Sequence, residues 1–283
     1  MSPRVSAPTP GGEFASVPTL RSPQYSQSLE RGLAILGYFS LEHHVLGITE
    51  LSDMLGMSRP TTHRYAATLV ALGYLERCSN HKYRLGLRVT DLGMSALTCT
   101  GLHEHSNPVL RDLHQYSSFT VSLTVLDSPE ILYVDRARSF RRGQYKIDLN
   151  LRLGSRLPAH CTAMGKVLLA GLPDRELTEI LARIELDRRG PNTITTRLAL
   201  SAVLERVREE GMAVNDEELA PGLLSIAVPV SNESRETIAA INMAAHTSMI
   251  SLTDLVDRLL PDLLAGADQI SARLGYRRDD EVV

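Results

Sequence analysis

The sequence predicts an α+β protein of two domains, in which a helical N-terminal module precedes a domain built on a mainly antiparallel sheet. Three observations support this class. Two amphipathic segments are joined by a tight turn at Gly56 and followed by a hairpin pattern. After residue 118, β-rich runs mix with helical ones. The 283 residues, 43% hydrophobic and 22% charged, are enough for two globular domains.

The composition excludes several classes of protein. The net charge of −3 argues against a uniformly basic nucleic-acid coat, although a basic patch can be hidden in such a total. Cys78, Cys99 and Cys161 are too few for a disulfide framework and suit a reducing compartment. No apolar run approaches the ~18 residues that span a bilayer, and no secretory signal is present. We therefore expect a cytoplasmic protein with no membrane segment.

The first helix follows an N-terminal tail. Residues 1–25 carry five prolines among small polar residues, and we expect disorder there and a second tail at 277–283. Leu29, Leu33 and their neighbours then recur at helical spacing, which predicts a helix with Ser28 as its N-cap.

Two more helices form the centre of the N-terminal domain, which we place at residues 26–88. The first has an apolar face and stops at Gly56. Ser58 is the predicted N-cap of the second, and Pro60 lies in its first turn, where no backbone N–H is needed. This second helix runs through about Leu72.

A hairpin and two linker helices are predicted next. Strand-like runs flank Ser79-Asn80, so the order of elements is that of a winged helix–turn–helix. Thr90 then caps a helix that runs from about Asp91 past residue 100, and another helix follows Pro108. We place the linker at 89–117.

The second domain is predicted to occupy residues 118–276. Its strands and helices mix, and a strand–turn–strand hairpin lies near its end, which favours an antiparallel sheet flanked by helices. The predicted strands are 119–126, 131–137, 212–214, 224–230 and 238–244, and the predicted helices are 162–169, 177–184, 198–209 and 251–274.

The winged motif predicts DNA binding. In this motif the N-terminal residues of the second helix enter the major groove. There Arg side chains hydrogen-bond guanine edges or phosphates, and Ser and Thr hydroxyls can bond to bases or to phosphates. The hairpin tip adds cations suited to the DNA backbone. The candidate DNA-binding residues are Thr49, Ser58, Arg59, Thr61, Thr62, His63, Arg64, His81, Lys82 and Arg84. The alternative is a three-helix module that binds protein and whose arginines are solvated.

The charge divides in the same way. Residues 1–95 hold nine Lys and Arg against seven Asp and Glu, whereas residues 96–283 hold 21 against 26. The predicted DNA reader is therefore faintly basic and the second domain acidic. Affinity for DNA should rest on a few placed cations and on dimer avidity rather than on bulk charge.

Five stretches, in this order and at these separations, carry a family resemblance that runs from about residue 26 to residue 274. They are Ser28–Leu36, Ile48–Leu55, Tyr83–Leu87, Pro158–Lys166 and Asn215–Gly222. Through them the sequence resembles the IclR family of bacterial transcriptional regulators.

The resemblance implies a winged-helix DNA-binding domain, a linker helix used in dimerisation, and a GAF-like domain that binds a small effector. Members usually act as homodimers or tetramers on palindromic double-stranded operators, because two-fold symmetry matches two half-sites. If the regulator is an activator, RNA polymerase is a further expected partner. The stretch from Tyr133 to Pro158 looks closest to the subgroup that governs the β-ketoadipate pathway. Those regulators answer to aromatic acids or their ring-cleavage products, so we expect a small anionic effector.

The effector pocket of the family lies between the sheet and the helix near the Gly-Lys pair. The positions that match it are Lys146, Leu149, Ala163, Met164, Asn215, Ser225, Asn242 and Ala244. Asn215 stands where some relatives carry Asp, and the missing negative charge favours an anionic ligand. Arg136, Arg138 and Lys146 are candidates to pair with its carboxylate. The alternative interpretation is that the arginines are solvated or form ion pairs at an interface, and that Met164 and Leu149 belong to the core and do not line a pocket.

Other signals carry less weight. His103 and His105, with His114, could suggest a metal site, but two histidines at this i,i+2 spacing do not share a helix face. His160 and Cys161 are adjacent, so their side chains point apart, and no third group is evident to orient them. No cofactor, metal or catalytic motif is present, so we expect no enzyme activity. The competing hypothesis is a small-molecule-binding protein or enzyme whose winged module contacts protein.

Overall fold

The computed structural model describes residues 25–40, 43–138 and 151–277. Contacts divide the chain into two compact units, Met1–Ala96 and Leu97–Val283. Over the described ranges, every helix is too short or too polar to cross a bilayer. The predicted tails, apart from Tyr25 and Arg277, lie outside these ranges.

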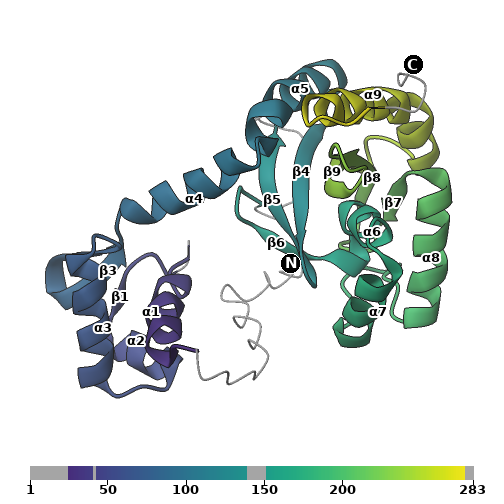
Figure 1. Ribbon diagram of the computed structural model, residues 1–283. Helices are drawn as coiled ribbons and strands as arrows, with labels where there is room; N and C mark the ends of the chain where they lie inside the picture. Colours follow the sequence, from purple (N-terminus) through teal and green to yellow (C-terminus); the bar gives the residue numbers. More distant parts are fainter. Residues whose placement is uncertain (1–24, 41–42, 139–150, 278–283) are drawn as a thin grey trace. The chain divides into compact units, whose positions relative to one another are not determined.

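The N-terminal unit is a winged helix–turn–helix (Figure 1). A three-stranded antiparallel sheet in the order β1-β3-β2 accompanies three helices, whose core includes Ile35, Leu51 and Ala66. The elements are α1 (Gln27–Gly37), β1 (Leu46–Gly47), α2 (Ile48–Leu55), α3 (Arg59–Ala71), β2 (Leu75–Arg77) and β3 (Lys82–Leu85), with the turn Ser79–His81 between the last two. The sequence did not predict β1, because two residues carry no periodicity.

The helix ends in this unit follow local chemistry. Gly56 ends α2 at φ +61°, a left-handed conformation that glycine adopts without strain. The hydroxyl of Ser58 accepts a hydrogen bond from Thr61 N at 3.4 Å and caps α3, as predicted. The prediction for α1 was wrong by two residues, because Ser26 rather than Ser28 caps it by accepting from Leu29 N.

Two helices predicted as a linker differ from expectation. The first, α4 (Arg88–Cys99), begins before Thr90, so Thr90 lies inside it and is not its N-cap. The second, α5 (Leu102–Ser117), begins six residues before Pro108. An interior proline removes a hydrogen bond and costs ~3 kcal/mol in a helix, but burial of one face of α5 against the sheet offsets it. Tertiary packing therefore extends this helix beyond the local signal.

The C-terminal unit contains a six-stranded antiparallel sheet in the order β6-β5-β4-β9-β8-β7. Its β6 was not predicted. The elements after α5 are β4 (Thr120–Asp127), β5 (Glu130–Ala137), β6 (Arg156–Pro158), α6 (Ala163–Ala170), α7 (Asp174–Arg183), α8 (Arg197–Glu210), β7 (Ala213–Asp216), β8 (Leu223–Ser231), β9 (Thr237–His246) and α9 (Leu252–Arg273).

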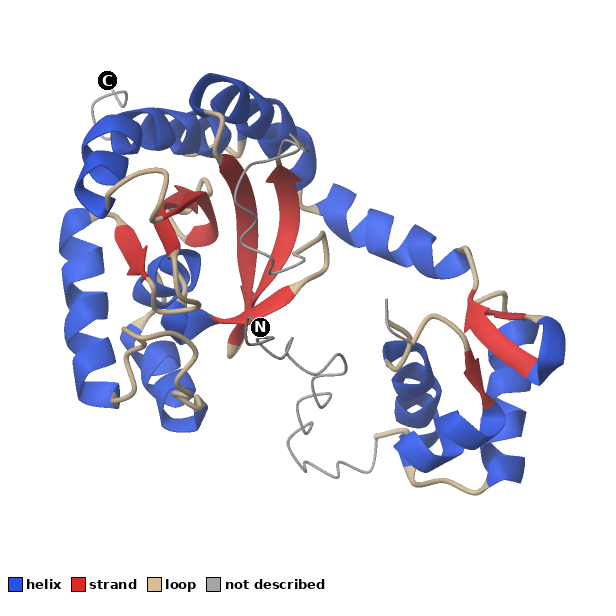
Figure 2. Cartoon of the chain, turned by 180° about the vertical axis from the view of Figure 1, so that it is seen from behind, coloured by secondary structure: helices blue, strands red, loops and turns tan. Residues whose placement is uncertain are grey.

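Helices cover both faces of this sheet (Figures 1 and 2). On one face α5 and α9 pack on large side chains such as Ile226 and Ile241. On the other face the strands present small residues, such as Ala227 and Ala240, to the fully buried α6, which α8 covers from behind. The antiparallel sheet and the helices on its two faces confirm the predicted α+β class. The small residues let α6 lie close against the sheet.

Candidate DNA-binding and effector-binding sites

The start of α3 presents exposed cations. Arg59, His63 and Arg64 are exposed, and none of them pairs with an acid among the described residues. Thr61 is half-buried, and its hydroxyl lies 2.8 Å from that of Ser58. These side chains surround the N-terminal end of the helix, where free backbone N–H groups also favour an anion such as phosphate.

One predicted DNA contact needs correction. Thr62 is completely buried in the N-terminal unit, and its hydroxyl donates to the carbonyl of Ser58 at 3.2 Å. A helix turns about 100° per residue, so the side chain after Thr61 points into the core. Thr49, in contrast, is exposed in the first turn of α2.

The wing carries cations that are already paired. Arg84 donates to Glu76 Oε2 through Nη2 at 2.8 Å and through Nε at 3.0 Å. Lys82 Nζ lies 3.7 Å from Oε1 of Glu50. His81 is exposed at the tip. Acids next to the wing therefore reduce its positive charge, and sequence spacing alone did not show these pairs.

In the C-terminal unit, three polar side chains form a row across the sheet on the α6 face. Arg136 on β5 lies opposite Ser122 on β4, which lies opposite Asn242 on β9. Ser122 and Asn242 are buried, and within the described part of the chain Oδ1 of Asn242 has no hydrogen-bond partner. Sequence reasoning missed Ser122, because only the strand register shows that it lies between two predicted residues.

Arg136 is a largely buried cation. Its Nη1 donates to Leu151 O at 3.0 Å, and its guanidinium lies 5.8 Å from the ring centre of Tyr133. Its Nε is buried and has no hydrogen-bond partner among the residues that the structure describes. Burial lowers the pKa of the guanidinium from its usual value, and nearby Arg138 lowers it further. The site therefore holds a desolvated donor, one of whose N–H groups is unpaired over the described ranges.

A second row lies beside the first. Asn215 on β7 pairs with Ser225 on β8, which pairs with Ala244 on β9. Asn215 is fully buried, but its amide bonds the chain itself: Nδ2 donates to Cys161 O at 2.7 Å and Oδ1 accepts from Glu218 N at 3.2 Å. Its contribution in this conformation is to join β7 to the segment before α6.

The remaining predicted effector residues differ in position. Ala163 and Met164 are buried at the start of α6, where the sulfur of Met164 accepts from Thr124 Oγ1 at 3.3 Å. Arg138 is exposed and directly follows the end of β5. Lys146 and Leu149 lie outside the described residues.

An ion pair behind α6 fixes the helix to the loop after β7. Lys166 Nζ contacts Oε1 of Glu218, and both side chains are buried. Burial raises the pKa of Glu218, and the positive charge of the neighbouring Lys166 reduces this rise. Thr193 Oγ1 donates to the Glu218 carbonyl at 2.6 Å and ties a third segment to the same place.

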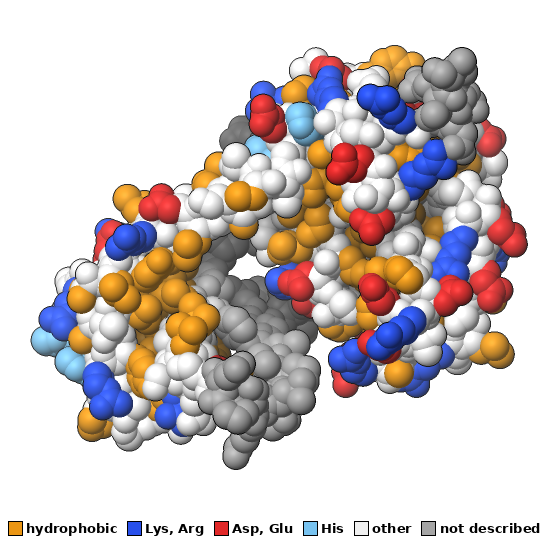
Figure 3. All heavy atoms as spheres, viewed as in Figure 1, with side chains coloured by type: hydrophobic (Ala, Val, Ile, Leu, Met, Phe, Trp, Pro, Cys, Tyr) orange, Lys and Arg blue, Asp and Glu red, His pale blue; other side chains and the backbone are white. Residues whose placement is uncertain are grey.

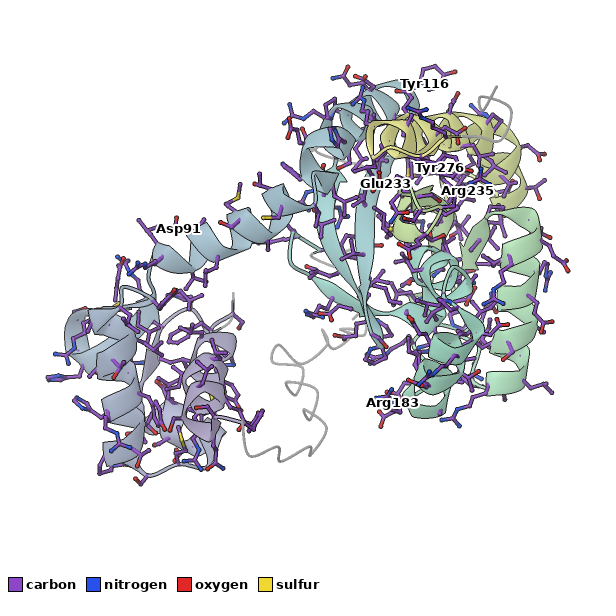
Figure 4. All side chains as sticks on the ribbon, in the orientation of Figure 1. Asp91, Tyr116, Arg183, Glu233, Arg235 and Tyr276 are labelled. Atoms are coloured by element: carbon purple, nitrogen blue, oxygen red, sulfur yellow. The ribbon has the colours of Figure 1, made fainter. Side chains whose placement is uncertain are left out.

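The structure also shows the surroundings of the histidines and the cysteine that the sequence did not favour as metal ligands or catalytic groups. Nδ1 of His114 lies 2.6 Å from Phe119 O, and Nε2 of His160 lies 3.1 Å from Asp187 O. The Cys161 thiol is buried, which raises its pKa to about 12, as expected for an unreactive thiol. A surface hollow of about 620 Å³ lies elsewhere, between the end of α7, marked by Arg183 in Figure 4, and the start of α8.

Comparison with known proteins decides the family. The family model described as the IclR helix-turn-helix domain matches residues 28–78, and the model described as the C-terminal domain of bacterial transcriptional regulator IclR matches residues 94–272. The chain belongs to the IclR family. It is therefore a member of a family of transcriptional regulators rather than of enzymes, which confirms the predicted family and its winged-helix DNA-binding domain.

Among curated relatives, the Pca regulon regulatory protein of Pseudomonas putida is 34% identical over 89% of this IclR-family chain and 85% of the relative. The p-hydroxybenzoate hydroxylase transcriptional activator of Acinetobacter baylyi is 35% identical over 89% of this chain and 93% of its own. The regulator KdgR of Escherichia coli is also 35% identical, over 83% and 88%. The level of identity is thus similar among regulators of different names.

Solved structures share the fold. A putative transcriptional regulator from Rhodococcus is 36% identical, with a TM-score of 0.77 over 88% of this chain and 98% of the other. An IclR homologue from Microbacterium hydrocarbonoxydans, solved with 4-hydroxybenzoate, is 26% identical, with a TM-score of 0.77 over 87% and 98%. The second of these proteins binds an aromatic acid.

Proposed function

We propose that this IclR-family regulator binds a small organic acid on the α6 face of its sheet and that the acid changes its affinity for operator DNA. The observation that carries the proposal is Arg136, which lies in a row with Ser122 and Asn242. Its buried Nε–H has no partner in residues 25–40, 43–138 and 151–277. Burying a charge without a partner is unfavourable, and an anion at this position would pair with it.

The row also suits the class of ligand. Small residues and apolar side chains surround a few polar groups, which is the usual composition of a small-molecule site. Arg136 supplies a donor at one end of the row and Asn242 an acceptor at the other. We propose an aromatic acid or a ring-cleavage product of the β-ketoadipate pathway. The Pca regulon regulatory protein and the p-hydroxybenzoate hydroxylase activator among the relatives support this class of ligand, as does the 4-hydroxybenzoate in one solved structure.

The decisive experiment is an operator-shift assay with the purified full chain. Operator fragments are first selected from genomic DNA, and 4-hydroxybenzoate, 3-hydroxybenzoate and β-ketoadipate are then added. We expect at least one acid to change the operator Kd, whereas the uncharged 4-hydroxybenzamide has no effect because it cannot pair with Arg136. If all the acids are inert and an unrelated metabolite acts, the pathway assignment is wrong.

We propose that Arg59 and Arg64 supply the DNA affinity of the recognition helix. Each replacement by Ala should weaken operator binding roughly 5- to 150-fold, since one good base or phosphate contact contributes about 1–3 kcal/mol. If an arginine contacts phosphate, the slope of log Kd against log salt should also fall by about 1. Binding of the effector acid should not change. A protein-binding winged module would instead show no selected operator and no effect of either variant.

We also propose that the regulator acts as a homodimer or tetramer. Apolar side chains are exposed on the N-terminal unit and along α4 (Figure 3), among them Leu87, which is 81% exposed, and Leu33, which is 51% exposed. Contiguous exposed apolar side chains of this kind mark interfaces. Sedimentation of the full chain tests the assembly, and paired half-sites in the selected operators would match its two-fold symmetry.

A further inference from the structure

A buried carboxylate ties β5 to the first two turns of α5. Asp135 is 2% exposed. Ser106 Oγ donates to its Oδ2 at 2.9 Å, and Asn107 Nδ2 donates to its Oδ1 at 3.2 Å. Nδ1 of His103 lies 3.4 Å from Oδ2. Hydrogen bonds to a buried charge are among the stronger ones in proteins, so the start of α5 follows the position of this carboxylate.

A β-bulge places Asp135 on the α5 side of the sheet. In the pairing of β4 with β5, Val134 has no partner opposite it. Neighbours in a regular strand face opposite sides, but here Val134 packs into the core with α5 and α9 while Asp135 also bonds α5. Arg136, the next residue, lies on the opposite side, near Tyr133 and Leu151 of the α6-face core.

The two faces are therefore joined through adjacent residues. The backbone N–H of Arg136 donates to Asp135 Oδ1 at 2.7 Å, so displacement of Arg136 moves the carboxylate that holds α5. In the chain, α5 follows α4 through Gly101, whose φ is +63°, and α4 begins directly after the wing. Thus one continuous segment runs from the winged motif to the residue that Asp135 holds.

We propose that Asp135 is the positioning residue that transmits effector binding at Arg136 to the start of α5, and so to operator affinity. The inference rests on the effector site proposed above. A ligand changes an equilibrium only by binding two arrangements unequally. The bulge provides the second arrangement, since moving it by one residue toward the C-terminus would turn Asp135 from the α5 side of the sheet to the α6 side.

The test uses the full chain and the substitution Asp135→Asn, which keeps the shape but lets the side chain accept fewer of its hydrogen bonds. We measure operator Kd without effector, operator Kd with 4-hydroxybenzoate, and the Kd of the acid itself. The variant should change the effector-free operator Kd by about fivefold or more. It should also reduce the effector-induced ratio, about 5–150-fold for typical coupling, to within about twofold of one. Acid binding should stay within about threefold of wild type, since Asp135 faces the other side of the sheet.

A matched pair of serine variants separates coupling from stability. Ser106→Ala removes a buried hydroxyl that bonds Asp135, whereas Ser271→Ala removes a buried hydroxyl of α9 that bonds Ser231 and Ala267. Both should lower Tm by a few degrees. Only Ser106→Ala should reduce the effector-induced ratio. If Asp135→Asn fails to fold, this pair carries the test.

Two results would overturn the inference. One is a folded Asp135→Asn protein with wild-type operator Kd and a wild-type response to the acid. The other is an equal response of the two serine variants. If 4-hydroxybenzoate does not act on the wild type, that outcome counts against the proposed effector class, and Asp135 is still judged by the effector-free operator Kd of its variant.

Discussion

Replacing Arg136 with Met is expected to weaken binding of the effector acid about 100-fold. Truncating one partner of a buried, hydrogen-bonded charge pair costs about 2–5 kcal/mol, because the other charge is left without a partner. The fold should tolerate the change, since Met fills a similar volume and the unpaired buried Nε–H is removed with the charge. Tm should therefore stay within a few degrees of wild type.

Calorimetric titration with 4-hydroxybenzoate measures this loss. Arg156→Met is the matched control, because Arg156 lies on the adjacent strand β6 but is exposed and pairs with Asp127 and Glu130. The control should bind the acid like wild type. If Arg136→Met binds the acid like wild type, the proposed effector site at Arg136 is wrong. If both variants lose acid binding, the substitutions disturb the edge of the sheet in general.

Replacing Lys166 with Met is expected to destabilise the C-terminal unit by about 3–5 kcal/mol, which lowers Tm by roughly 10 °C. The substitution removes the cation that contacts the buried carboxylate of Glu218. The paired variant Lys166→Met with Glu218→Leu should recover most of the loss, because a buried ion pair replaced by apolar side chains of similar volume is often neutral or stabilising. Thermal unfolding of the two variants and of Arg156→Met measures the difference.

The penalty in Lys166→Met should depend on pH in a defined direction. Burial raises the pKa of Glu218 in the folded protein above its unfolded value. The buried negative charge destabilises the variant fully at pH values above that folded pKa, and the penalty fades as pH falls through it and the carboxyl group becomes neutral. A loss of stability relative to wild type that is the same at pH 5.5 and pH 8 would show that Glu218 is solvated in the variant.

Local signals located most elements of the fold. Gly56, Ser58 and Pro60 defined the turn and the start of α3, because caps and turn residues act through backbone groups a few positions away. The same reasoning failed at α5. Pro108 marked a helix start by local rules, but the helix extends back to Leu102, where Leu102 and Ser106 are buried in the domain.

The candidate sites were less accessible to sequence reasoning. The arginines of α3 were found, because a recognition helix exposes them in a fixed pattern, but the adjacent Thr62 faces the core. In the second domain Asn242 was named from the family resemblance, and Arg136 from its charge, as a partner for the carboxylate of an anionic ligand. Only the register of β4 showed that Ser122 lies between them. In the wing, Glu50 lies 32 residues from its partner Lys82, and Glu76 lies 8 residues from its partner Arg84, so sequence spacing did not show either pair.

By itself the sequence determined the class of this protein, which is a winged-helix DNA-binding domain followed by an α+β domain. It also showed that the first part is faintly basic and the second acidic. Periodicity, capping and composition act locally, so one chain is sufficient to show them. Only the tertiary structure decided which side chains share a face. A single extra residue at Val134 turns Asp135 toward α5, next to an Arg136 that faces α6, and a bulge depends on the pairing of two strands rather than on either strand alone.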